Sequence, residues 1–345
     1  MKTFTEMQFR VLYTRAFLLL IAGILLFPLW QSDLTFKTIA TNFRGKVFLS
    51  GYFNQTRILL GDRYFDSVIV GKEGWLYFVG GDGKAAFWDG NKFKTEKIDT
   101  VATDISDFNQ KLLSMGTRLL IVIAPDKSTI YPQYLPDEIQ FSENPTYTDL
   151  LVERLKSKNV HVLDLRETLI KLVDEEQVFY KTDSHWNISG DYAAYKAVID
   201  EISIYEPTLM PTPFSDLKIV SIGSITRDIP KVLRINNIME ESFLLQPKKN
   251  KDLKVDAVPL DSGRNFLFAK NSGTDQPTVL IYHDSFFTHV VPLMQQNFHQ
   301  TLSMFYPATL PEVWNSGWVD QFQPAYVIIE FTERVLPVAD WPIYR

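Results

Sequence analysis

Residues 119–124 (LLIVIA) decide the fold class of this chain, because six apolar residues follow one another without a polar interruption. Such a strand is typical of a parallel sheet in which helices cover both faces. Residues 95–115 come shortly before it and carry apolar side chains at helical spacing, with Gly116 as the stop. The segment therefore predicts a buried strand that follows an amphipathic helix.

The alternation of helices and strands continues along the chain and predicts an α/β fold with a doubly wound, mostly parallel sheet. The expected helices are residues 148–155, 166–174, 191–202 and 286–296, and the expected strands are residues 160–163, 278–282 and 325–331. Residues 207–277 interrupt this alternation, because they are richer in Pro, Lys, Asp and Asn. We expect them to form an insertion that borders the functional site, within a catalytic domain at residues 61–345.

The N-terminus carries a targeting signal in which basic residues precede an apolar run at residues 16–30. These basic residues are Lys2, Arg10 and Arg15. A signal peptide and a short membrane helix both fit, but no small-x-small cleavage site follows, which favours an uncleaved anchor. The positive-inside rule then places the later residues outside the cytoplasm. We expect a leader and signal anchor at residues 1–32 and a tether at residues 33–60.

Composition excludes several classes of function. The formal net charge of −6 argues against a nucleic-acid partner, because neutralising phosphates needs a basic surface. The absence of cysteine excludes disulfides, thiolate catalysis and cysteine metal sites. Any nucleophile must therefore be an oxygen or an amine.

Two short segments have the residue types of a serine triad. Ser285 follows the expected strand at 278–282, and a serine at a strand-to-helix turn is presented at the carboxyl edge of the sheet. His185 could act as its base, and Asp183 in the same segment could orient the imidazole ring. Sites in α/β folds form at this edge, so the two segments can meet there. We predict that the Ser285 oxygen lies within about 3.2 Å of a His185 ring nitrogen.

Other interpretations of these residues stay open at this point. An Asp-Ser pair is commonly a helix cap, and an Asp-x-His segment is commonly a turn. His283 and His289 flank Ser285 and are rival bases. A metal could bind Asp183, His185, His283 and Asp284, but this set lacks a recognisable zinc spacing. We therefore expect neither a metal nor another cofactor.

Four motifs in order resemble the SGNH-hydrolase-like proteins that O-acetylate alginate and related exopolysaccharides. The motifs are residues 71–77 (GKEGWLY), 124–127 (APDK), 131–136 (YPQYLP) and 182–187 (TDSHWN). The resemblance implies a periplasmic acetyltransferase, anchored here to the inner membrane, with Asp183 and His185 as triad acid and base and Ser285 as nucleophile. It also implies work with a membrane-bound acyltransferase and an exopolysaccharide secretion machinery.

The order of the motifs differs from that of ordinary SGNH hydrolases, in which the serine strand comes first. Here it follows the Asp-x-His segment, so the resemblance implies an SGNH-like sheet with a circularly permuted motif order. The entry to Ser285 is also His-Asp-Ser instead of Gly-Asp-Ser, and no Gly-x-Asn-Asp follows the last strand. We add four candidate substrate-binding or oxyanion residues, which are Arg334, Lys127, Asn187 and Trp186.

Three functions fit these observations. The first is an O-acetyltransferase that acts on an exported polysaccharide through an acetyl-Ser285 intermediate. The second is a polysaccharide acetylesterase, because transfer and hydrolysis share this intermediate and differ only in the acceptor. The third is a non-catalytic polysaccharide-binding scaffold in a secretion complex, since a fold does not fix a function. The presence of all three triad residue types favours an enzyme.

Overall fold

The computed structural model describes residues 19, 46–80, 95–139, 144–259, 265–305 and 317–336. The chain divides into two compact units, residues 1–56 and 57–345. Helix α3 (Lys46–Leu59) begins in the first unit and ends in the second. The second unit contains the central sheet and the candidate site.

The predicted signal anchor lies outside the described residues, apart from Leu19. Among the helices that the structure does describe, none combines the length and the apolar character that crossing a membrane requires.

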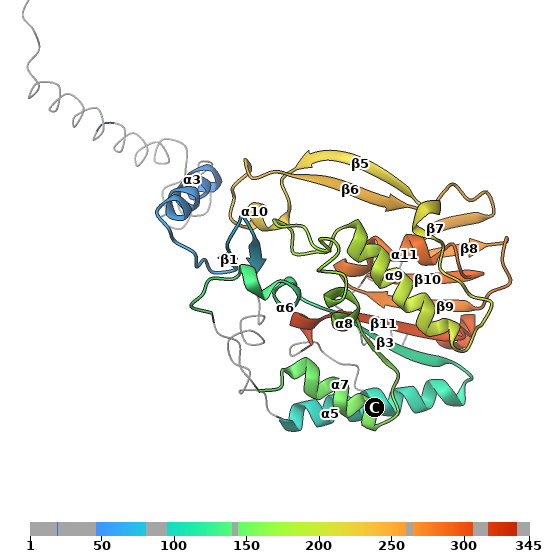
Figure 1. Cartoon of the computed structure of the whole chain (residues 1–345). Coiled ribbons are helices and arrows are strands. Elements are labelled where there is room, and N and C mark those ends of the chain that lie inside the picture. The colour runs from blue at the N-terminus through green and yellow to red at the C-terminus, as the bar shows by residue number, and fades with distance from the viewer. Residues whose placement is uncertain are drawn as a thin grey trace, which may run out of the picture. The chain divides into compact units, whose positions relative to one another are not determined.

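A seven-stranded mixed sheet forms the centre of the second unit, in the order β4-β3-β11-β9-β10-β8-β7 (Figure 1). Neighbouring strands are parallel from β4 to β10, whereas β8 and β7 pair antiparallel at one edge. The strands are β3 (Arg118–Ala124), β4 (Val162–Asp164), β7 (Leu253–Pro259), β8 (Asn265–Asn271), β9 (Thr278–His283), β10 (Gln300–Phe305) and β11 (Tyr326–Thr332). The predicted α/β class is confirmed. The sheet is mixed, because β8 and β7 add antiparallel strands from a stretch in which the sequence predicted none.

Helices cover both faces of this sheet, as a doubly wound fold requires (Figure 1). Helices α5 (Thr95–Ser114) and α7 (Tyr147–Ser157) pack on one face, against alternate residues of β3 that include Ile121. Helices α8 (Leu165–Ile170), α9 (Ile188–Ser203) and α11 (Val290–Met294) pack on the other face, against Val122 and its neighbours. Successive strand residues thus enter different cores, which explains the unbroken apolar run.

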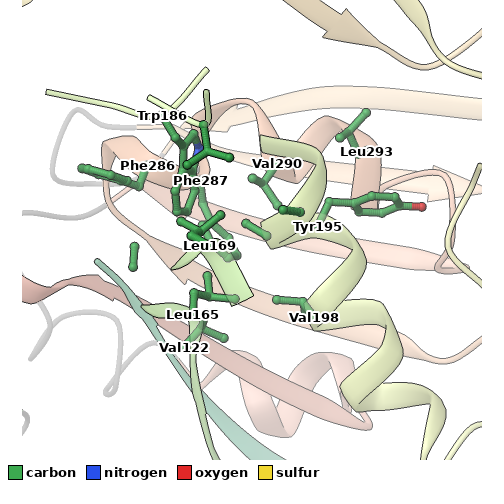
Figure 2. Packing of buried hydrophobic residues seen from close by; sticks show 14 of the residues in the cluster. Val122, Leu165, Leu169, Trp186, Tyr195, Val198, Phe286, Phe287, Val290 and Leu293 are labelled. Atoms are coloured by element: carbon green, nitrogen blue, oxygen red, sulfur yellow. The ribbon is translucent and has the colours of Figure 1, made fainter. Parts of the chain in front are cut away.

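The core on the α9 face reaches the candidate site. Trp186, Phe286 and Phe287 gather at one end of this cluster, with Leu165 and Leu169 below them (Figure 2). The rings of Trp186 and Phe286 meet edge to face, with centroids 5.0 Å apart. Side chains next to the predicted histidine and the predicted serine therefore belong to one hydrophobic cluster.

The stretch 207–277 divides between two structures. Strands β5 (Lys218–Ile225) and β6 (Glu240–Gln246) form a two-stranded antiparallel sheet of their own among the described residues, and the short helix α10 (Asp228–Val232) lies between them in the chain. Strands β7 and β8 instead extend the central sheet next to β10. Part of the predicted insertion therefore belongs to the sheet itself.

The parallel strands place their carboxyl ends at one edge of the sheet. In register, Phe305 of β10 lies beside His283 of β9, and Thr332 of β11 lies beside Ala124 of β3. Candidate residues follow three of these strands: Ser285 comes after β9, Lys127 after β3 and Arg334 after β11. Ligand and substrate sites of α/β sheets form at this edge.

Candidate active site

The nucleophile turn, residues 283–285, is fixed to the central sheet through Asp284. One carboxylate oxygen, Oδ2, accepts hydrogen bonds from the Thr332 backbone N–H (2.9 Å) and from Thr332 Oγ1 (2.5 Å). The other oxygen accepts one from the Phe286 N–H at 2.9 Å, which caps the 3-10 helix η4 (Ser285–Thr288). The Asp284 N–H donates to Glu330 Oε2 at 2.9 Å. Strand β11 therefore holds Ser285 in place.

Ser285, His185 and Asp183 lie together as a hydrogen-bonded chain. His185 Nε2 lies 2.8 Å from Ser285 Oγ, within the predicted distance of about 3.2 Å. His185 Nδ1 lies 2.7 Å from Asp183 Oδ1, which also accepts the His185 backbone N–H at 3.0 Å. A carboxylate on Nδ1 fixes the ring tautomer, so that Nε2 can accept the proton of the serine. The arrangement has the chemistry of an activated serine nucleophile.

Lys127 binds the backbone of residues 180–185, which we call the acid–base loop. Lys127 is the first residue of the short helix α6 (Lys127–Ile130), and its side chain is buried. Nζ donates to the backbone carbonyls of Tyr180 (3.0 Å), Lys181 (2.9 Å) and Asp183 (2.5 Å). Burial lowers the pKa of Lys127 to about 7, against the opposite pull of nearby carboxylates. These bonds fix the course of the loop and point the ammonium away from solvent.

The charge state of the triad carboxylate follows from its neighbours. Burial alone would raise the pKa of Asp183, but the hydrogen bonds of His185 and the Arg227 guanidinium hold that pKa well below its usual range. Burial and the nearby Asp183 charge raise the pKa of Asp228, whose Oδ2 lies 3.7 Å from His185 Nδ1. Asp183 is therefore the permanent anion beside the imidazole ring.

Comparison with known proteins identifies the family of this chain. The model of a family described as SGNH hydrolase-like domain, acetyltransferase AlgX, matches residues 68–329, about three quarters of the chain. The chain belongs to this family. The predicted resemblance is thereby confirmed.

Individual relatives of this AlgX-type domain match over shorter stretches. The probable alginate O-acetylase AlgJ of Pseudomonas aeruginosa is 25% identical over 128 residues, which cover 36% of this chain and 30% of that protein. The same protein of Pseudomonas syringae pv. tomato is 26% identical over 123 residues, with the same two coverages. The chain thus spans less than a third of the length of these curated relatives.

Solved structures share the fold of the AlgX-type domain. PatB1 of Bacillus cereus has a TM-score of 0.59 at 14% identity and covers 81% of this chain and 100% of its own. That protein has also been solved with a sulfonyl adduct. The O-acetyltransferase domain of Pseudomonas putida AlgJ has a TM-score of 0.55 at 18% identity, covering 79% of this chain and 93% of its own. At these identities the likeness extends to the fold alone.

Four further residues were predicted to bind substrate or an oxyanion. The polar groups of three of them bind other parts of the protein. Trp186 is buried and donates its Nε1–H to Asp191 (2.8 Å), so its ring is not open to a sugar. Asn187 caps α9, where its side chain accepts the N–H groups of Ser189 and Gly190. Lys127 binds loop carbonyls, as described above. A direct role of these three in substrate binding is therefore not supported, because their polar groups are already used.

Arg334 is the fourth, and it borders the nucleophile turn. Its guanidinium lies 5.3 Å from the ring centroid of Phe286, the residue after Ser285, and 5.4 Å from that of Phe78. Nη1 donates to Asp126 Oδ1 at 2.5 Å, which directs the arginine toward the loop after β3. Of the four, Arg334 is the one that brings a cationic group near the ring of Phe286, the residue after Ser285.

Sequence reasoning missed a group of charged residues that support the acid–base loop from the stretch 207–277. Arg227 Nη1 lies 3.4 Å from Asp183 Oδ2, and Asp228 accepts the Ser184 N–H at 2.8 Å and the Ser184 hydroxyl. Glu240, at the start of β6, accepts the N–H groups of Lys181 and Thr182 at 2.9 Å and Thr182 Oγ1 at 2.7 Å. The local signal for this group is Arg227-Asp228 at the start of α10, but an aspartate in the first turn of a helix is ordinary, because negative charge is favourable there.

The rival histidines have partners of their own. His283 is buried, its Nδ1 lies 2.8 Å from the Asp284 carbonyl, and burial lowers the pKa of its ring. His289 Nδ1 lies 3.5 Å from the buried Asp191, and this carboxyl raises the pKa of His289. His185 is the histidine whose ring nitrogen meets Ser285 Oγ.

Potential metal ligands gather in the described part of the chain at Asp183, His185 and Asp228, whose ligand atoms lie within 4.8 Å of one another. His283 and Asp284 are not members of this group. Each of the three already has protein partners: Asp183 binds His185, and Asp228 binds Ser184. The group is accounted for by the triad and the support of its loop.

Proposed function

We propose that this chain is an O-acetyltransferase that carries the acetyl group on Ser285. The observation that carries the proposal is the continuous hydrogen-bonded chain of 2.8 Å and 2.7 Å from Ser285 Oγ through His185 to Asp183. Membership of an acetyltransferase family supports acyl transfer as the reaction. Asp183 stays anionic and stabilises the imidazolium that forms when His185 takes the serine proton.

The reaction has two half-reactions that use the same residues. In the first, Ser285 Oγ attacks the acetyl carbonyl carbon of the donor while its proton moves to His185 Nε2. The bond between acetyl and donor then breaks, and His185 returns the proton to the departing donor atom. In the second, a sugar hydroxyl gives its proton to His185 and its oxygen attacks the acetyl-serine. Ser285 leaves with the proton, and the ester is now on the sugar.

The negative charge of each tetrahedral intermediate needs hydrogen-bond donors. The Ser285 backbone N–H, at the first residue of η4, is one proposed donor. Arg334 is the second, on the strength of its place beside Phe286. A guanidinium there would stabilise the negative charge of the developing oxyanion without taking part in proton transfer.

The acceptor that we propose is an exported polysaccharide. The AlgJ relatives are named for alginate, which makes an anionic polymer of this kind the first acceptor to test. An anchored position outside the cytoplasm, with a membrane-bound acyltransferase as the source of acetyl groups, fits the basic leader and apolar run at residues 1–32. Alkaline phosphatase fused after Gly51 tests this topology, because the fusion is active only outside the cytoplasm. An inactive fusion, with a cytoplasmic reporter active at the same point, contradicts it.

The chemical test follows one acetyl group. The full-length chain is mixed with 4-nitrophenyl acetate, and intact-mass spectrometry measures the acetyl-enzyme before and after alginate is added. We expect acetyl-Ser285 to accumulate in the wild-type chain and to pass to the polymer. Ser285→Ala should give no acetyl-enzyme, whereas His283→Gln should retain it. Acetylation of Ser285→Ala to the wild-type extent contradicts the nucleophile, and release of free acetate with no acetylated polymer indicates an esterase.

A further inference from the structure

Arg227 occupies an unusual position for an arginine. It is buried, with 9% of its surface exposed, and its guanidinium carbon lies 3.4 Å from the centroid of the Tyr180 ring. Its Nη1 approaches Asp183 Oδ2 at 3.4 Å. Neither Nε nor Nη2 has a hydrogen-bond partner among the residues that the structure describes. Buried donors without partners destabilise a fold, so this arginine calls for an explanation other than stability.

The surroundings of Arg227 indicate which atom it serves. Asp183 Oδ1 accepts both hydrogen bonds from His185, whereas Oδ2 faces the guanidinium. Stacking on Tyr180 holds the planar cation in one orientation, and Tyr180 is itself tied to β6 through Phe243. Because the unpaired nitrogens are buried, a substrate cannot reach them. The cation therefore acts on the triad carboxylate.

We propose that Arg227 is a positioning residue for the triad: it holds the Asp183 carboxylate turned so that Oδ1 meets His185 Nδ1. Its neighbour Asp228 holds Ser184, so the two adjacent residues fix both sides of the loop that carries the acid and the base. Arg227 does not touch the reacting atoms. The region that interrupts the βα alternation thereby determines how well Ser285 is activated. This inference rests on the proposed function of Ser285.

The test measures activation of Ser285 without any acceptor or natural donor. The full-length chain is treated with phenylmethanesulfonyl fluoride, in which Ser285 Oγ displaces fluoride from sulfur and its proton passes through His185. Mass spectrometry gives the rate of labelling at Ser285. The variants are Arg227→Met, which removes the charge, Arg227→Lys, which keeps it, and the matched control Arg154→Met. Arg154 lies on α7 and forms ion pairs with Asp99 and Glu153. Neither partner belongs to the triad or to the acid–base loop.

We expect Arg227→Met to slow labelling by about ten- to a hundredfold, the range found for residues that orient the histidine and carboxylate ligands of metals from the outer shell. Its thermal melting temperature should change little, because Nε and Nη2 have no partners among the described residues and the single contact of Nη1, with Asp183, is long at 3.4 Å. Arg227→Lys should recover part of the rate, because it keeps the charge but not the planar stack on Tyr180. Arg154→Met should label at the wild-type rate. Wild-type labelling in Arg227→Met overturns the inference. A fall in melting temperature with an unchanged rate also overturns it, because the role is then structural.

A spectroscopic measurement decides cases in which rate and stability fall together. The Nδ1–H proton of His185, in its 2.7 Å contact with Asp183, gives a low-field proton resonance that is assigned by its loss in His185→Ala. Arg227→Met should shift or broaden this resonance at a temperature where the variant is folded, and Arg154→Met should not. An unchanged resonance overturns the inference. If the wild-type chain is not labelled at Ser285 at all, the proposed function fails, and this outcome differs from all those of the variants.

Discussion

The nucleophile turn takes its contacts from the central sheet, whereas the acid–base loop takes its contacts from side chains outside that sheet. Asp284 binds Thr332 and Glu330 of β11, so the position of Ser285 is set by a buried strand. The acid–base loop is held by Lys127, by the pair Arg227 and Asp228, and by Glu240. The first region should lose stability and activity together when it is changed, and the second should lose activity with less effect on stability.

The largest effect should come from Asp183→Asn, on the loop side of this comparison. The amide would favour the wrong tautomer of His185, so that Nε2 carries a proton and cannot accept one from Ser285. We expect kcat/KM for 4-nitrophenyl acetate to fall by about four orders of magnitude, with a cooperative thermal melt still present. Loss of less than tenfold in the rate would show that Asp183 is not the triad acid.

Asp284→Asn probes the other side and should affect both properties. An amide NH₂ group would have to face either the Thr332 N–H or the Phe286 N–H, which are both donors. Because hydrogen bonds to a charged acceptor are among the stronger ones, we expect the free energy of unfolding to fall by about 2 kcal/mol. Urea unfolding measures this change, and the ester assay should show a loss of activity as Ser285 moves. Activity lost at unchanged stability would break the comparison.

Glu240→Gln should sharpen the comparison, because Glu240 accepts as many hydrogen bonds as the Asp284 side chain. The glutamine keeps one acceptor oxygen, so the acid–base loop loosens without leaving a large cavity. We expect about tenfold lower kcat/KM, in the range seen for residues that support a catalytic group. The free energy of unfolding should fall by less than in Asp284→Asn, because Glu240 belongs to the separate two-stranded sheet β5-β6 and its contacts do not join strands of the central sheet. A larger loss of stability than in Asp284→Asn would reverse the ranking of the two regions.

The smallest effect concerns Glu333, directly after β11. Burial and the neighbouring Asp126 raise its pKa from 4.5 to about 7. Between these two values the folded chain holds a proton that the unfolded chain has released, so the free energy of unfolding falls as pH rises from about 4.5 to about 7. Glu333→Gln should flatten this part of the curve. At pH 8 the free energy of unfolding of Glu333→Gln should exceed that of the wild-type chain by less than about 1 kcal/mol, because the substitution weakens the contacts with Thr129 and Arg166. Melts of both proteins across this range test it, and parallel curves contradict it.

The parts of the fold that repeat a simple pattern could be predicted from the sequence. The helix expected at residues 95–115 is α5, and the buried strands expected at 278–282 and 325–331 are β9 and β11. The helix expected at 286–296 is instead η4 followed by α11, with a break at His289. Strands β7 and β8 were missed because the composition of their surroundings indicates loops. The alternation of apolar and charged residues along β7 is the signal that identifies it.

The candidate site was predictable where function needs particular residue types in short motifs. Ser285, His185 and Asp183 stand out in the sequence because a nucleophile, a base and an acid have few substitutes. The support by Arg227, Asp228 and Glu240 depends on distances between segments that are remote in the chain, which no local pattern encodes. Trp186 and Asn187 show the opposite case: they belong to the motif, but the motif needs them to build the loop and to start α9.

The position of β11 has a consequence for how the chain acquires its structure. This strand comes last in sequence among the strands of the central sheet, yet it lies in the middle, between β3 and β9. A polypeptide that emerges from the ribosome with its N-terminus first holds two unjoined half-sheets until residues 326–332 are available. Pairing across such long sequence separations is slow. Because Thr332 and Glu330 are also the anchors of Ser285, the nucleophile reaches its working position only when this final strand closes the sheet, and a nascent or truncated chain carries an unassembled triad.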